Sequence, residues 1–173
     1  MAGPDPKRLY LLRHAKSDWD DPELADHERP LAPRGKRASK AIAKHLVEEG
    51  IEPALVLCSS AVRTRETLDR IASALGSPEV EIEDELYGAG AATLLERLRR
   101  VPDSAAAVML IGHNPGIEEL AMELAGTGED LERMERKYPT AALATLTVPG
   151  DSWSELDAGR SEVVGYVLPR ELE

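Results

Sequence analysis

Three absences limit what this chain of 173 residues can be. It has one cysteine, Cys58, so an intrachain disulfide is impossible, which favours a reducing, cytoplasmic compartment. No segment approaches the ~20 consecutive apolar residues that a membrane-spanning helix requires. Residues 1–8 also lack the apolar stretch of a secretory signal peptide. We therefore expect a soluble protein that is neither exported nor inserted in a membrane.

Aromatic side chains and positive charge are also scarce. Phenylalanine is absent and aromatic residues make up 3% of the chain, so the core must consist of Leu, Val, Ile and Ala side chains. The net charge is −11. Because a surface that binds nucleic acid needs an excess of positive charge, nucleic acid is not an expected partner. An acidic protein can still bind an anion where its few cations converge.

Short apolar runs alternate with segments whose apolar residues recur with the period of a helix. The expected strands cover residues 7–13, 54–57, 79–82, 105–111, 143–148 and 162–168. The expected helices cover residues 34–49, 61–75, 91–100, 115–125 and 131–137. This alternation predicts an α/β fold of three layers, α/β/α, with a mainly parallel central sheet and helices on both faces. The length fits a single domain over residues 1–173.

Histidine and arginine stand directly after three of the expected strands. Arg13 and His14 follow the first strand, Arg63 comes shortly after the second, and His113 follows the strand at 105–111. In a parallel sheet, ligands bind at the carboxyl ends of the strands. Arg63 lies at the start of a helix, where the helix dipole disfavours a cation, and a bound anion would explain that placement. The sequence therefore predicts an anion site at this edge of the sheet.

These residues carry a resemblance to a known family. The segment Leu11-Leu12-Arg13-His14-Ala15-Lys16-Ser17 resembles the opening motif of the histidine phosphatase superfamily, which includes the phosphoglycerate mutases. Its second motif is similar to Ser59-Ser60 with Arg63-Thr64 and Glu66-Thr67, and its third is similar to Gly112-His113-Asn114-Pro115. Three further features resemble the SixA-like phosphohistidine phosphatases: Arg29-Pro30-Leu31, Gly35 and Tyr138-Pro139-Thr140. The resemblance covers about residues 8–168 and implies a phosphoglycerate mutase-like fold.

The resemblance implies that His14 is the catalytic nucleophile. A neutral imidazole can attack phosphorus in line and form a phosphohistidine intermediate, which water then hydrolyses. Neighbouring guanidinium groups favour the neutral imidazole, because like charges disfavour its protonation. A hydrogen bond from the second ring nitrogen of His14 to a backbone carbonyl would fix the tautomer.

The other implied site residues bind the phosphoryl group. Arg13 and Arg63 would each hold two phosphate oxygens with a planar guanidinium. His113, implied as the second catalytic histidine, would contact a third oxygen. We also predict phosphate contacts from Ser17 and from the backbone N–H of Asn114. No metal ion and no cofactor is expected, because the arginines supply the charge stabilisation that a divalent ion supplies in kinases.

The general acid is the least determined part of the predicted site. Asp84 and Glu85 are the candidates, and we favour Glu85, although both belong to an acidic run that is typical of a solvated surface. A phosphohistidine substrate would need no such acid, since its imidazole leaves easily. Arg29 could contact substrate or form a salt bridge, and Lys16 could line the pocket rim or face solvent. We interpret His27 as a solvated loop residue.

The preferred hypothesis is a metal-independent phosphatase that acts on protein phosphohistidine or on a small phosphoester. A phosphoglycerate-type mutase is disfavoured, because few residues separate Glu85 from the next strand and could enclose a phosphosugar. From other classes, we considered a phosphate-binding module without turnover, and a hydrolase whose metal ion binds His14, His113 and Asp18 or Asp20. His14 argues against the module, and the two arginines would repel a divalent cation.

Overall fold

The computed structural model describes residues 6–172, which form a seven-stranded sheet with the strand order β3-β2-β4-β1-β6-β7-β5. The strands are β1 (Arg8–Arg13), β2 (Leu55–Ser59), β3 (Glu79–Glu83), β4 (Ala107–Gly112), β5 (Ala125–Thr127), β6 (Leu143–Thr147) and β7 (Ser161–Val167). Among these strands β6 alone runs antiparallel to its neighbours. The predicted mainly parallel sheet is therefore confirmed.

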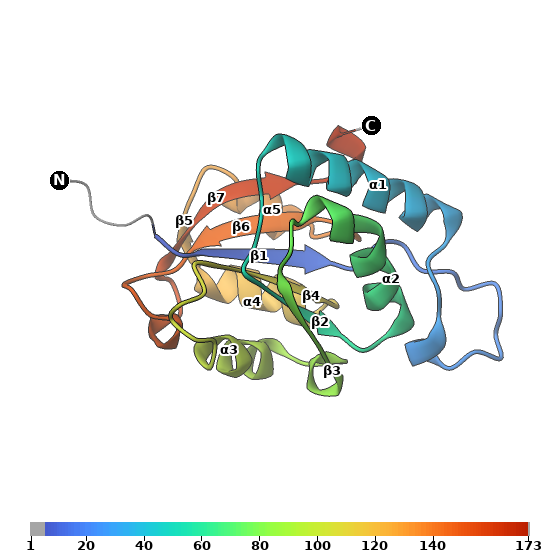
Figure 1. The fold of residues 1–173 in the computed structure, drawn as a ribbon, viewed down its shortest axis with the longest axis horizontal. Helices are drawn as coiled ribbons and strands as arrows, with labels where there is room; N and C mark the ends of the chain where they lie inside the picture. The colour runs from blue at the N-terminus through green and yellow to red at the C-terminus, as the bar shows by residue number, and fades with distance from the viewer. Residues whose placement is uncertain (1–5, 173) are drawn as a thin grey trace.

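Helices cover both faces of this sheet (Figure 1). They are α1 (Pro33–Glu48), α2 (Val62–Ile71), α3 (Ala91–Arg99), α4 (Gly116–Leu124) and α5 (Leu131–Arg136). The pair α1 and α2 packs over one apolar cluster, and the pair α3 and α4 packs over the other. The predicted three-layer α/β/α architecture is confirmed.

Two elements differ from the expected pattern. The strand β5 was not predicted, because its sequence Ala-Gly-Thr has neither apolar alternation nor β-branched enrichment. Helix α2 ends at Ile71 and continues as a 3-10 turn over Ala72–Ala74, where the sequence predicted one helix to residue 75. The bounds of the other predicted elements agree with the structure within two residues.

Aliphatic side chains build the core, as the composition predicts. Trp153 is fully buried in the core and donates its indole N–H to the Ala105 carbonyl at 2.8 Å. Cys58 is buried in β2, and burial raises the pKa of its thiol to about 12, so it remains protonated as an apolar packing group. None of the helices within residues 6–172 is long and apolar enough to cross a bilayer.

The register of the central strands determines which residues meet at the carboxyl edge of the sheet. Strands β1 and β4 pair in parallel, with Arg13 opposite Gly112 at their ends. On the other side of β4, strand β2 pairs with Cys58 opposite Ile111. The residues that follow these three strand ends therefore emerge side by side.

The segment after β1 packs closely against the first turn of α1. A Cβ atom at Gly35 would lie 2.1 Å from the backbone oxygen of Lys16, a separation that no side chain tolerates. The Lys16 backbone therefore lies directly against the start of α1. The same Lys16 oxygen accepts a hydrogen bond from the Ala32 N–H at 2.9 Å. Position 35 therefore requires glycine, which has no Cβ atom to collide with the Lys16 backbone.

We predict that Gly35→Ala lowers the free energy of unfolding by about 1–3 kcal/mol, because α1 must shift away from Lys16. Urea denaturation measures this change. Gly165→Ala is the matched control, since its Cβ would meet Thr145 at an ordinary 3.6 Å and should cost less than about 1 kcal/mol. Equal effects from both substitutions would show that the Gly35 contact does not constrain the fold.

Candidate active site

Two histidine rings face each other at the carboxyl ends of β1 and β4. The ring centroids of His14 and His113 are 5.3 Å apart. The placement follows from strand register, because each histidine directly follows one member of the Arg13–Gly112 pair. The His14 N–H also donates to the Gly112 carbonyl at 3.0 Å. Both side chains are buried, with 7% and 8% of their surface exposed.

The environment of His14 holds the ring neutral and fixes its tautomer. Its Nδ1 lies 2.7 Å from the Ala15 carbonyl oxygen, which can only accept, so Nδ1 carries the proton and Nε2 carries the lone pair. Burial is the largest cause that lowers the pKa of His14, the Ala15 hydrogen bond opposes it, and the nearby His113, Arg63 and Arg13 add to the lowering. Together these effects bring the pKa to about 3. At neutral pH the ring is therefore an uncharged nucleophile.

His113 is held by one ring nitrogen and leaves the other without a partner. Its Nε2 lies 2.7 Å from the Ser59 Oγ, which comes from the end of the neighbouring strand β2. Its Nδ1 is buried and has no hydrogen-bond partner among the described residues. Burial and then Arg63 lower the pKa of His113, Asp26 opposes them, and the net pKa is about 4. A buried polar atom without a partner is costly, and a bound oxyanion would satisfy it.

Arg13 is directed into the site by the backbone of the segment that precedes β6. Its Nη1 donates to the Tyr138 carbonyl at 3.0 Å, and the Asn114 side chain donates to the same oxygen at 2.9 Å. Its buried Nε finds no partner in the described part of the chain. Burial lowers the pKa of Arg13, Glu118 raises it, and the like charge of Arg63 lowers it, so the two guanidinium groups lie within electrostatic range of each other.

Arg63 is paired with a carboxylate from the loop that follows β1. Its Nη1 donates to the Asp26 backbone oxygen at 2.7 Å, and its Nη2 donates to the Asp26 Oδ2 at 2.9 Å. The Tyr87 hydroxyl donates to the same Oδ2 at 2.6 Å. The Tyr87 hydrogen bond and then Arg63 hold the pKa of Asp26 below its usual value, against the effect of burial. Asp26 is thus an ionised carboxylate, and it occupies the guanidinium of Arg63 that is predicted to bind phosphate.

Side chains of α2 connect this helix to the loop that carries the site. The Thr67 Oγ1 accepts from the Ala15 N–H at 3.0 Å and donates to the Arg63 carbonyl at 2.7 Å. Glu66 accepts from the Leu31 N–H at 3.0 Å. These bonds fix residue 15, beside His14, relative to Arg63. The motif residues Glu66 and Thr67 therefore have positioning roles.

The rest of that loop is ordered by two side-chain contacts. The His27 Nε2 lies 2.9 Å from the Ser60 Oγ, so His27 is not the solvated residue that the sequence suggested. The Arg29 guanidinium stacks over the exposed Trp19 ring at 4.0 Å and lies 3.8 Å from the Asp26 carboxylate. Of the two alternatives for Arg29, the structure shows the salt bridge.

Glu85 was predicted as the general acid, and the structure does not place it with the histidines. Its carboxylate pairs with Arg100 at 3.0 Å and with Arg97 at 3.8 Å, so it belongs to an ion-pair group with α3. The adjacent Asp84 is exposed. The acidic run thus matches cations at the end of α3, and the role of Glu85 as general acid stays a prediction.

The phosphate contacts from Ser17 and from the Asn114 backbone N–H stay predictions. Ser17 is buried three residues after His14 and pairs across a β-bridge with Leu31. The Asn114 amide bonds to the Tyr138 carbonyl and accepts from the Glu118 N–H, so its side chain supports the start of α4. Lys16 is exposed at the rim of the site.

Sequence reasoning missed Asp26 and Tyr87, and recorded Ser59 only as part of a motif. Asp26 and Tyr87 are far apart in the chain and carry no periodic signal, so nothing local connects them to Arg63. Ser59 could have been found, because it ends the strand that lies beside β4 in a parallel sheet. The short 3-10 elements Asp26–Glu28 and Asp84–Leu86, which position the first two residues, are also difficult to predict.

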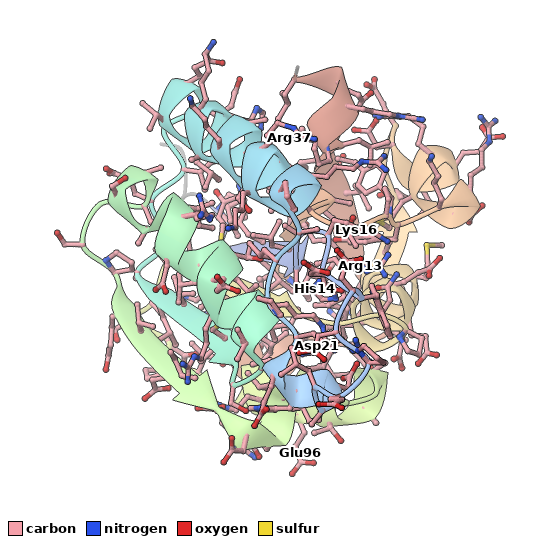
Figure 2. All side chains as sticks on the ribbon, turned by 90° about the vertical axis from the view of Figure 1, so that its right-hand side faces the viewer. Arg13, His14, Lys16, Asp21, Arg37 and Glu96 are labelled. Carbon is pink, nitrogen blue, oxygen red and sulfur yellow. The ribbon has the colours of Figure 1, made fainter. Side chains whose placement is uncertain are left out.

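The assembled site combines two neutral imidazoles with two guanidinium groups. Figure 2 looks onto the carboxyl end of β1 and shows Arg13, His14 and Lys16 gathered there, with Asp21 on the loop to one side. Such a site can attract an anion, fix it with planar donors and attack it with the Nε2 lone pair of His14. No three metal-ligating side chains cluster within residues 6–172.

Comparisons with known proteins agree with this geometry. Residues 9–100 match the family description "histidine phosphatase superfamily (branch 1)". The protein Rv1276c of Mycobacterium tuberculosis is 37% identical over 163 residues, which cover 92% of this chain and all of the relative. Phosphohistidine phosphatase SixA of Escherichia coli is 27% identical over 144 residues, covering 82% of this chain and 85% of that protein.

Solved structures share the fold. A crystal structure from Agrobacterium tumefaciens, described as a phosphohistidine phosphatase SixA, superposes with a TM-score of 0.82 at 30% identity, over 96% of this chain and 100% of the other. A SixA protein histidine phosphatase complexed with tungstate superposes with a TM-score of 0.74 at 24% identity, over 96% and 99% of the two chains.

Both buried histidines should make stability depend on pH. Their folded pKa values of about 3 and about 4 lie below the usual 6.5, so below pH 6.5 the unfolded chain binds protons that the folded chain does not. We predict that the free energy of unfolding falls as pH drops from 6.5 towards 4, by about 1.4 kcal/mol per pH unit for each histidine. In urea titrations at several pH values, His14→Gln should reduce this slope, and an unchanged slope would contradict the assignment.

Asp26 should compete with an anionic ligand for Arg63. We predict that Asp26→Asn strengthens the binding of inorganic phosphate by about tenfold, because a carboxylate no longer occupies the guanidinium. The backbone contact from Arg63 to residue 26 is retained in this variant. Isothermal titration calorimetry measures the affinity, and Asp20→Asn, in the same loop, is the control that should leave it unchanged. Weaker phosphate binding in Asp26→Asn would refute the competition.

Proposed function

Since the chain belongs to the histidine phosphatase superfamily, branch 1, we propose that it is a metal-independent phosphatase whose His14 forms a phosphohistidine intermediate. Arg13, Arg63 and His113 are proposed to bind the phosphoryl group. Ser17 and the backbone N–H of Asn114 are proposed as further contacts. We also propose a reducing, cytoplasmic location, in keeping with the single buried thiol of Cys58.

One observation carries this proposal. Among residues 6–172, two buried nitrogen atoms of the proposed site residues lack hydrogen-bond partners, the His113 Nδ1 and the Arg13 Nε. The His113 ring lies 5.3 Å from the ring of His14, and Arg13 precedes His14 in the chain. Unsatisfied buried groups of this kind are rare in folded proteins, and they are expected where a ligand completes the hydrogen bonding. The ligand must be an anion, because both neighbouring guanidinium groups are permanently charged. A phosphoryl group meets all of these requirements.

The residues then have distinct parts in the proposed reaction. The Nε2 of His14 attacks phosphorus as the bond from phosphorus to the leaving group breaks, and the leaving group takes that electron pair. Arg13 and Arg63 stabilise the charge on the equatorial oxygens, and His113 donates to one of them. Water then attacks the phosphohistidine, the phosphorus–nitrogen bond breaks, and inorganic phosphate leaves with neutral His14 restored. The Ala15 carbonyl keeps the tautomer throughout by accepting from Nδ1.

The acid–base groups favour a substrate with a good leaving group. Asp26 is the carboxylate that raises the pKa of His113 by its charge. Its own pKa is lowered, so it stays ionised and cannot donate a proton. Glu85 is occupied by Arg97 and Arg100. An alkoxide would depart slowly without an acid, whereas the imidazole of a phosphohistidine needs no such help. Protein phosphohistidine is therefore the proposed substrate, with small phosphoesters as the alternative.

We predict that His14→Ala lowers kcat for an aryl phosphate by about a thousandfold or more, because the nucleophile is lost. A rapid quench of the wild-type enzyme with labelled substrate should trap an acid-labile, base-stable label at residue 14. His45→Ala, a histidine of α1 away from the site, is the matched control and should retain activity. Substantial turnover by His14→Ala with the fold intact would refute the proposal.

A further inference from the structure

A groove beside the candidate site is lined by cations. It has a volume of about 310 Å³, and its charged lining residues are Lys16, Arg34, Lys137 and Arg170. Within residues 6–172 none of these four side chains pairs with a carboxylate. Four unpaired cations around one groove are unexpected in a chain with a net charge of −11.

The groove lies close to His14. Lys16 comes two residues after His14, so its backbone lies within about 7 Å of it. Thr140, which also lines the groove, precedes Ala141, whose N–H donates to the His14 carbonyl at 3.0 Å. A ligand long enough to extend beyond the phosphoryl group held at His14 therefore comes within reach of the groove.

The positive surface continues from the groove along the exposed face of α1. Three cations, Arg37, Lys40 and Lys44, follow Arg34 at helical spacing, and all are exposed, whereas Ile42 and Leu46 are buried on the opposite face. From Arg34 to Lys44 this row extends about 15 Å. A second hollow beside it is lined by Lys36, Arg37, Lys40 and Arg70. We call the groove together with this row the basic surface.

Fold stability does not explain these cations. The helix dipole disfavours positive charge in the first turns of a helix, and the first turn of α1 contains no acidic residue. The N-cap residue Ala32 forms no side-chain cap. Placing Arg34, Lys36 and Arg37 there therefore costs stability, which is expected where the charges serve binding.

Charge of the opposite sign lies across the site. The loop between β1 and α1 carries six acidic residues from position 18 to position 28. Figure 2 shows Lys16 and the α1 residue Arg37 on one side of His14 and Asp21 on the other. An acidic ligand segment is repelled by this loop and attracted by α1. A ligand bound at His14 is therefore oriented with its acidic segment towards α1.

We propose that the basic surface binds an acidic segment of the protein that carries the phosphoryl group, and so selects phosphoprotein substrates with clustered Asp or Glu beside the phosphorylated residue. The inference rests on the proposed function. A protein segment fits better than a small phosphoester, because the row on α1 extends well beyond the groove.

The test uses two synthetic phosphohistidine peptides of equal length, one with glutamates and one with glutamines around the histidine. We expect kcat/KM to favour the acidic peptide by about tenfold at low salt, and this preference to shrink at high salt. Arg37→Gln/Lys40→Gln and Lys137→Gln/Arg170→Gln should each reduce the preference to about twofold, while turnover of an aryl phosphate by the first variant stays unchanged. Arg160→Gln, an exposed cation at the opposite edge of the sheet, is the matched control.

A binding assay separates this inference from the proposed function. Fluorescence anisotropy measures the affinity of the unphosphorylated acidic peptide for the His14→Ala protein. If this peptide binds but neither phosphopeptide is hydrolysed, the basic surface is supported and phosphohistidine is rejected as the substrate. Equal kcat/KM for both phosphopeptides would refute the role of the basic surface in substrate binding. The proposal that the protein is a phosphatase would remain. Self-association that Arg37→Gln/Lys40→Gln abolishes would assign the surface to a second copy of the chain and also overturn the inference.

Discussion

The site depends on the parallel, in-register pairing of β1 with β4. Because Arg13 lies opposite Gly112, the two residues that follow, His14 and His113, leave the sheet at the same height with their rings 5.3 Å apart. A shift of one residue in this register would turn alternate side chains to the other face and separate the two rings. The buried apolar clusters on both faces of the sheet therefore maintain the geometry of the site as well as the stability of the fold.

Backbone carbonyls hold three of the side chains of the site in place. The Tyr138 carbonyl accepts from Arg13, the Asp26 carbonyl accepts from Arg63, and the Ala15 carbonyl accepts from His14. Carbonyl oxygens cannot change protonation state, so they orient these groups without competing for protons. The side-chain carboxylate of Asp26 is different, because it pairs with Arg63 through a group that can bind a proton and it opposes the lowering of the His113 pKa.

The sequence predicted the fold class, the order of the elements and the convergence of His14 with His113, because those features follow from apolar periodicity and from the rule that parallel strands end together. It did not predict that Arg63 binds Asp26, or that Glu85 pairs with α3, because both contacts depend on where loops and short 3-10 turns fold back. The resemblance gave Gly35 and Tyr138 as markers of a branch. Their physical reasons, a close backbone approach and a shared carbonyl, needed coordinates.

The two tryptophans of the chain occupy opposite environments. Trp153 is sealed in the core, whereas Trp19 is 60% exposed on the loop that carries Asp26 and stacks under Arg29. Indole emission shifts to longer wavelength in contact with water, so the two residues form separate spectral populations, and a quencher dissolved in the buffer reaches only Trp19. The native protein thus contains its own optical reporter of loop displacement, with an internal reference that responds only when the core opens.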